Sequence, residues 1–69
     1  MTVDLVVNGE PLRVPEGATV ADVVNRVLPG GCTGTAVALA DEVVPAGQWA
    51  TTRVAAGDQM EILQAVAGG

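Results

Sequence analysis

The last three residues, Ala67-Gly68-Gly69, are the part of this sequence whose residue types could do chemistry. A carboxylate on Gly69 would stand on a thin stalk that can enter a narrow active site, because glycine has no Cβ and accepts almost any backbone conformation. With an ordinary pKa of about 3.5, this carboxylate is ionised at neutral pH and is a poor electrophile. It must be activated, for example as an acyl-adenylate, before a sulfur nucleophile can attack it. Glycines are also common at ends that do no chemistry, so these residues alone leave both interpretations open.

The rest of the chain is poorly equipped to carry out that activation. It has 69 residues, room for one domain, and contains no histidine and no lysine. It also has no glycine-rich phosphate-binding motif. We therefore expect a protein that is not an enzyme, with no catalytic residues, no metal site and no bound cofactor. ATP would be used by a separate activating partner.

Charge, cysteine content and hydrophobic patterning exclude further functional classes of protein. Three basic against eight acidic residues give a net charge of -5, whereas a nucleic-acid-binding domain needs a basic surface. The single cysteine, Cys32, can form no internal disulfide and cannot supply the four thiolates of an iron–sulfur cluster. Because the chain has no histidine or lysine to lower the pKa of Cys32, we expect an inert thiol rather than a persulfide relay. An acid at Asp4 does not fit a signal peptide, and no run of about 18 apolar residues occurs to span a membrane. These features predict a cytoplasmic protein without nucleic-acid or membrane partners.

The first 14 residues predict a β-hairpin. Residues 2–7 alternate as in a strand with one buried face, and Asn8-Gly9 is typical of a two-residue turn. Residues 10–14 should return antiparallel with Leu12 and Val14 facing inward. Pro11 indicates that this second strand lies at an edge of the sheet.

A helix should follow, because apolar residues then recur at helical spacing. The predicted apolar stripe consists of Val20, Val23, Val24, Val27 and Leu28. Thr19 and Asp22 have the spacing of a capping box, and Pro29-Gly30-Gly31 ends the helix.

Shorter elements are predicted beyond a loop at residues 32–35. Residues 36–40 form an apolar strand that ends at an acidic turn, Asp41-Glu42, and residues 43–45 form a second short strand or an edge. Residues 48–53 should contain a short helical turn carrying Trp49. As the only aromatic residue in the chain, Trp49 is expected to pack in the core rather than to anchor a partner.

The last strand should span residues 59–66, after a turn at Gly57-Asp58. Strand alternation sends Met60 and Ile62 under the helix and places Leu63 on the opposite face. The first strand should lie beside this one and add Val6 to that opposite face. Exposed apolar residues near a functional tail indicate a docking surface.

Together these elements predict an α+β domain, a ubiquitin-like β-grasp whose mixed sheet of about four or five strands carries one main helix on one face. The domain should cover residues 1–66. Residues 67–69 would form a flexible Ala-Gly-Gly tail.

Motifs in the second half resemble the ThiS family, the sulfur carrier proteins of thiamine biosynthesis. The residues that carry the resemblance are Ala38-Leu39-Ala40, Val44-Pro45, Gln48-Trp49, Gly57-Asp58-Gln59 and Ala67-Gly68-Gly69. The first half agrees more loosely, through the hairpin and the amphipathic helix.

This resemblance implies a thiocarboxylate on Gly69. It would be formed by a ThiF-like adenylating enzyme together with a sulfur donor system that draws on cysteine, and thiazole synthase, ThiG, would take the sulfur into the thiazole ring. Glu61 and Ala65 stand where this family often has larger apolar residues. The expected docking residues are Val6, Glu61, Leu63 and Ala65.

Two other functions fit a β-grasp domain with this tail. One is the small sulfur-carrying subunit of molybdopterin synthase, although the spacing of Val44-Pro45 and Gln48-Trp49 favours thiamine. The other is a ubiquitin-like modifier conjugated to lysines of target proteins. The acidic residues are interpreted as a solvated surface or, alternatively, as acids that meet a basic partner. They are Asp41, Glu42, Asp58 and Glu61.

Overall fold

Within residues 1–28 and 34–64, the part of the chain that this computed structural model describes, the protein forms a five-stranded sheet, one α-helix and one 3-10 helix. In chain order the elements are β1 (Thr2–Val7), β2 (Glu10–Pro15), α1 (Val20–Val27), β3 (Thr35–Leu39), β4 (Glu42–Val44), the 3-10 helix η1 (Ala46–Gln48) and β5 (Gln59–Gln64).

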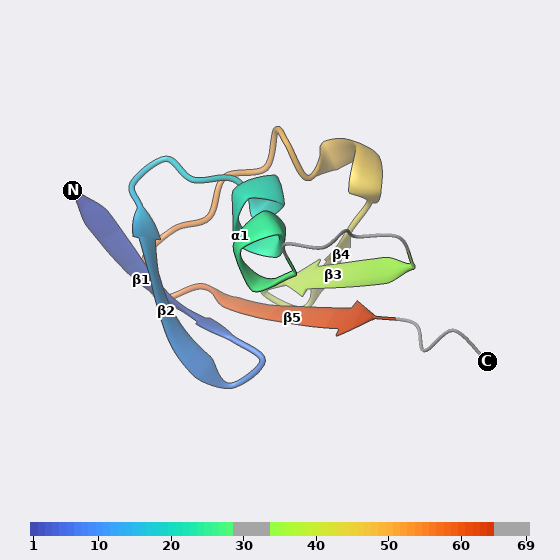
Figure 1. Ribbon diagram of the computed structural model, residues 1–69, viewed down its shortest axis with the longest axis horizontal. Coiled ribbons are helices and arrows are strands. Elements are labelled where there is room, and N and C mark those ends of the chain that lie inside the picture. Colours follow the sequence, from blue (N-terminus) through green and yellow to red (C-terminus); the bar gives the residue numbers. More distant parts are fainter. Residues whose placement is uncertain (29–33, 65–69) are drawn as a thin grey trace.

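The last strand, β5, lies in the middle of the sheet, whose strand order is β2-β1-β5-β3-β4 (Figure 1). β1 and β5 are parallel, and every other neighbouring pair is antiparallel. Parallel neighbours need a long crossover connection, and α1 lies within the segment that joins them. A last strand returning beside the first, with one helix on the sheet, is the β-grasp arrangement, so the predicted fold class is confirmed.

The first hairpin has the predicted turn. Asn8 and Gly9 have positive φ angles of 52° and 82°, as a type I′ turn requires. Pro11 lies opposite Val6 on the edge strand β2, which confirms its predicted edge position. Of the two residues predicted to face inward, Val14 is buried and Leu12 is half-buried.

The helix begins with the predicted capping box. The Thr19 hydroxyl accepts a hydrogen bond from the Asp22 amide at 3.2 Å, and the Asp22 carboxylate accepts one from the Thr19 amide at 2.9 Å. The helix ends at Val27, because Leu28 leaves the helical conformation. Val27 is 37% exposed at the margin of the predicted apolar stripe. The proposed stop at Pro29-Gly30-Gly31 lies outside the described residues.

The second hairpin turns one residue earlier than predicted. Ala40 and Asp41 both have positive φ, at 51° and 68°, and Leu39 pairs with Glu42. The turn is therefore Ala40-Asp41, not Asp41-Glu42, and β4 begins at Glu42. Neither Ala nor Asp marks such a turn as clearly as Asn-Gly does, so strand pairing rather than turn chemistry sets the position.

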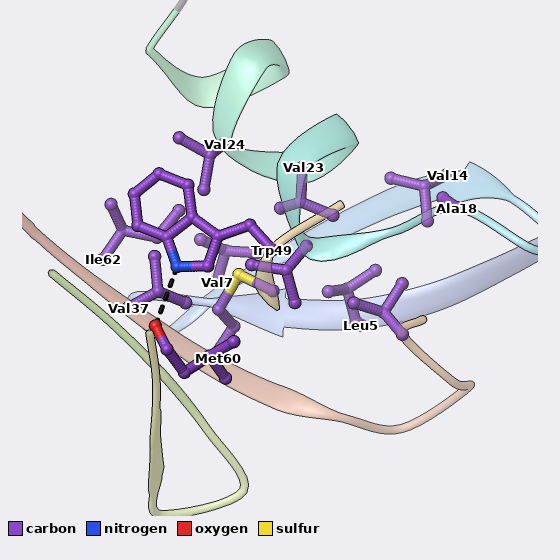
Figure 2. Packing of buried hydrophobic residues seen from close by; sticks show 13 residues of the cluster. Leu5, Val7, Val14, Ala18, Val23, Val24, Val37, Trp49, Met60 and Ile62 are labelled. Carbon is purple, nitrogen blue, oxygen red and sulfur yellow. Dashed lines mark hydrogen bonds between the residues drawn. The ribbon is translucent and has the colours of Figure 1, made fainter. Parts of the chain in front are cut away.

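Trp49 packs in the core, as predicted. It immediately follows η1, which begins two residues before the helical turn expected from the sequence. Its ring lies among core valines, and its Nε1–H donates a 2.8 Å hydrogen bond to the Val44 carbonyl (Figure 2). This contact joins the segment after β4 to the end of that strand.

The core fills the space between α1 and one face of the sheet. Val23 and Val24 of the helix face Leu5, Val37 and Met60 of the strands (Figure 2). β5 is described from Gln59 to Gln64, and the last two residues of the predicted strand lie outside the described part of the chain. Among the residues described, no helix is both long enough and apolar enough to cross a membrane.

Candidate functional site

The central strand β5 is the last described element before the predicted site of chemistry in the sequence. It is paired with β1 on one side, and with β3 on the other as far as Gln64, which lies opposite Thr35. Gly69, Gly68 and Ala67 follow in the chain and lie outside the described residues, as does Cys32. The domain therefore offers a strand bonded on both edges as the base from which the last residues depart.

The sheet face opposite the helix contains the described members of the predicted docking set. Along β5, Met60 and Ile62 are buried at 1% and 6% exposure, whereas Leu63 is 65% exposed. Val6 is half-buried and Glu61 is exposed on the same open face. The side chains of β5 therefore alternate between the helix-covered face and the open face as predicted. Ala65 lies outside the described residues.

Neighbouring strands extend this open face with apolar side chains that the sequence analysis did not select. Ala36 of β3 lies opposite Leu63, and Ala38 lies opposite both Glu61 and Val43. Val43 is 77% exposed, and it was missed because the segment after the second turn was too short to assign its faces. Alternation with the buried Val44 is the signal that could have found it.

A hollow of about 260 Å³ opens on this face. Val6 and Glu61 both line it, so the structure brings these two predicted residues together, while Leu63 is not among the lining residues. The lining residues are Val6, Gly9, Ala38, Asp41, Gln59, Met60 and Glu61. Two carboxylates, Asp41 and Glu61, give the hollow an acidic character that suits a basic side chain of a partner.

The four predicted surface acids do not have the same role. Asp41, Glu42 and Glu61 are exposed, in agreement with a solvated surface. Asp58 is half-buried, and its Oδ2 accepts a 2.7 Å hydrogen bond from the Ala55 amide. Asp58 thus stabilises the turn that precedes β5.

An ion pair lies on the same sheet at the β1–β2 hairpin. The Arg13 guanidinium donates from Nε to Asp4 Oδ1 at 2.8 Å, between side chains that are 70% and 66% exposed. This hydrogen bond and the positive charge of Arg13 lower the pKa of Asp4 below its ordinary value of 3.8. The same contact raises the pKa of Arg13. Within residues 1–28 and 34–64, no three potential metal ligands come together as a binding cluster.

These features define a class: a ubiquitin-like β-grasp domain whose central strand is followed in the sequence by a Gly-Gly motif and whose open sheet face is partly apolar. The family can also be stated. The ThiS family model matches residues 4–69, and the chain belongs to the ThiS family.

Comparison with solved structures agrees. One match is the crystal structure of the thiamine biosynthesis protein ThiS from Geobacter metallireducens, with 29% sequence identity and a TM-score of 0.79. The match covers 97% of this chain and 100% of that one. The curated proteins provided no match to the chain.

Proposed function

We propose that this protein is a sulfur carrier of thiamine biosynthesis, and that its Gly69 carboxylate is converted to a thiocarboxylate. The observation that carries the proposal is the extent of the family match, which runs from residue 4 through Gly69 and so includes the Gly-Gly motif. The similar structure from Geobacter metallireducens, described as a thiamine biosynthesis protein, favours thiamine over molybdopterin as the pathway.

The proposed chemistry has two steps, both of which involve the carboxyl group of Gly69. A carboxylate oxygen of Gly69 attacks the α-phosphorus of ATP, and pyrophosphate leaves. Hydrosulfide, or an equivalent sulfur nucleophile, then attacks the carbonyl carbon of the acyl-adenylate, where a C–S bond forms as the C–O bond to AMP breaks. The thioacid releases its proton to solvent. Adenylation provides AMP as the leaving group. No change in oxidation state is needed when hydrosulfide is the donor, because its sulfur is already at the sulfide level of a thiocarboxylate.

In this proposal the protein is a co-substrate and other proteins supply the catalytic groups. A ThiF-like enzyme would bind ATP and adenylate Gly69, and thiazole synthase would later accept the sulfur. Both partners need a surface to hold, and the open sheet face is suited to this task. It presents the apolar side chains of Leu63 and Val43, 65% and 77% exposed, beside the acidic hollow. A small apolar patch with an acidic margin suits transient binding to successive partners.

Intact-mass spectrometry tests the proposed function. The protein is incubated with ATP, hydrosulfide and a ThiF-like adenylating enzyme, and its mass should rise by the difference between sulfur and oxygen. Fragmentation should place the sulfur on Gly69. The matched control is Cys32→Ser, which should gain the same mass. Sulfur located only on Cys32, or a protein found joined to lysines of other proteins, would overturn the proposal.

A further inference from the structure

Asn8 makes a two-point contact with the backbone of the strand that leads to Gly69. Its side-chain Oδ1 accepts a hydrogen bond from the Ile62 amide at 2.8 Å, and its Nδ2 donates one to the Ile62 carbonyl at 3.2 Å. The two residues are 54 positions apart in the chain, so this contact joins the first hairpin turn to the last strand.

The contact extends the ladder of hydrogen bonds between β1 and β5 beyond the point where the backbone of β1 turns away. The amides of Val6 and Asn8 donate to the carbonyls of Asp58 and Met60, each at 2.9 Å. The chain then turns away at Asn8, where φ is 52°. A carboxamide carries the same donor and acceptor pair as a peptide group, so the Asn8 side chain replaces the next peptide and bonds Ile62.

The turn itself does not require this contact. A positive φ at Asn8 is met equally well by glycine, which has no side chain to bond β5. On its other edge, β5 is paired with β3 up to Gln64, opposite Thr35. On the β1 edge, the Asn8 carboxamide extends the pairing past Met60 to Ile62. The carboxamide therefore restrains the β1 edge of β5 at Ile62, two residues before the last described residue of the strand, Gln64.

We propose that Asn8 is a positioning residue of the carrier, which fixes the line along which β5 delivers Gly69 to the active sites of its partners. This inference rests on the proposed function. Reaction rates fall steeply when reacting atoms are displaced, so a β5 strand that is held on both edges as far as Ile62 favours correct placement of the carboxylate. Binding to the partner depends on the open face instead, and Asn8 is not among the residues selected for docking.

The test compares Asn8→Gly with a variant of similar stability loss elsewhere. Asn8→Gly keeps the turn and removes both bonds to Ile62. Asp22→Ala removes one half of the helix capping box, on the far side of the core from the open face. For each protein, hydrogen exchange of the Ile62 amide and the kcat and KM of Gly69 thiocarboxylate formation are measured with ATP, hydrosulfide and the adenylating enzyme.

Asn8→Gly should expose the Ile62 amide to faster exchange and lower kcat several-fold at unchanged KM. Asp22→Ala should speed exchange of the Ile62 amide no more than that of the other β5 amides, and should leave kcat and KM at the values of the unmodified sequence. The inference is wrong if Asn8→Gly exchanges faster at Ile62 yet keeps its kcat, if only its KM rises, or if Asp22→Ala loses kcat equally. If the unmodified protein gains no sulfur at Gly69, the proposed function itself fails, and that outcome is distinct from the others.

Discussion

Ile62 and Leu63 are consecutive residues of β5 that face opposite environments: Ile62 is 6% exposed beneath the helix, and Leu63 is 65% exposed on the open sheet face. The register is fixed by β3, where Val37 and Ala36 lie opposite them. The same substitution at these two positions should therefore separate folding from binding.

Leu63→Asp should fold normally and bind the adenylating enzyme and thiazole synthase more weakly. Its free energy of unfolding should change by no more than about 0.5 kcal/mol, as is usual for exposed positions. Ile62→Asp should unfold the domain, because it buries an unpaired charge in a protein of marginal stability. Circular dichroism and a binding titration on both variants provide the measurement. Unfolding of Leu63→Asp alone would contradict this assignment of the faces.

Gly68→Val should impair adenylation without changing the melting temperature. The branched side chain would stand next to the Gly69 carboxylate and obstruct its entry into a narrow active site. Stability should be unchanged because the sequence predicts a flexible tail at residues 67–69, outside the folded domain. Thermal unfolding and the rate of pyrophosphate release measure the two effects. A normal adenylation rate for this variant would argue against a narrow entry.

Ala40→Gly should stabilise the protein by about 1 kcal/mol, because a left-handed conformation is costly for alanine and free of that cost for glycine. Ala40 has a φ of 51° in the β3–β4 turn. Ala36→Gly, at the second residue of the same hairpin's first strand, provides the opposite control and should destabilise the protein by roughly 0.5–1 kcal/mol. Urea denaturation gives both values, and equal effects of the two substitutions would be inconsistent with a strained turn.

Trp49→Phe should lower the free energy of unfolding by about 1–3 kcal/mol, because the Val44 carbonyl loses its buried donor. Val43→Thr changes the exposed residue next to Val44, and it should lower the free energy of unfolding much less. Since the first variant removes the only tryptophan, unfolding is followed by circular dichroism. A Trp49→Phe protein as stable as the original would mean that this hydrogen bond contributes little.

The Asp4–Arg13 pair should be visible in an acid titration. Because the folded-state pKa of Asp4 lies below its ordinary value of 3.8, the stability from this pair is present above that value and is lost as pH falls through the lowered pKa. In Arg13→Gln, the NMR titration midpoint of the Asp4 carboxyl should move upward. The difference should shrink in 1 M salt, where charges are screened over about 3 Å. Identical midpoints in the two proteins would show that the pair has no effect in solution.

Local sequence signals predicted the elements that depend on local interactions. The helix follows from the spacing of Val20, Val23 and Val24 and from the Thr19–Asp22 capping box, all within two turns of chain. The first hairpin follows from Asn8-Gly9, since few other dipeptides accept two positive φ angles. The Gly-Gly motif is likewise visible in the sequence. So is the alternation of inward and outward side chains along β5, and the exposures of Ile62 and Leu63 confirm their predicted faces.

Only the tertiary structure decided the features that depend on distant residues meeting. The second turn lies at Ala40-Asp41 because strand pairing overrides the weak turn preference of those residues. The hollow forms because β1, β3 and β5 bring Val6, Ala38 and Glu61 to one place. Asn8 bonds Ile62 across 54 residues, a contact without any local signal. Sequence periodicity reports which face of an element is apolar, whereas the choice of neighbour is set by the packing of the whole chain.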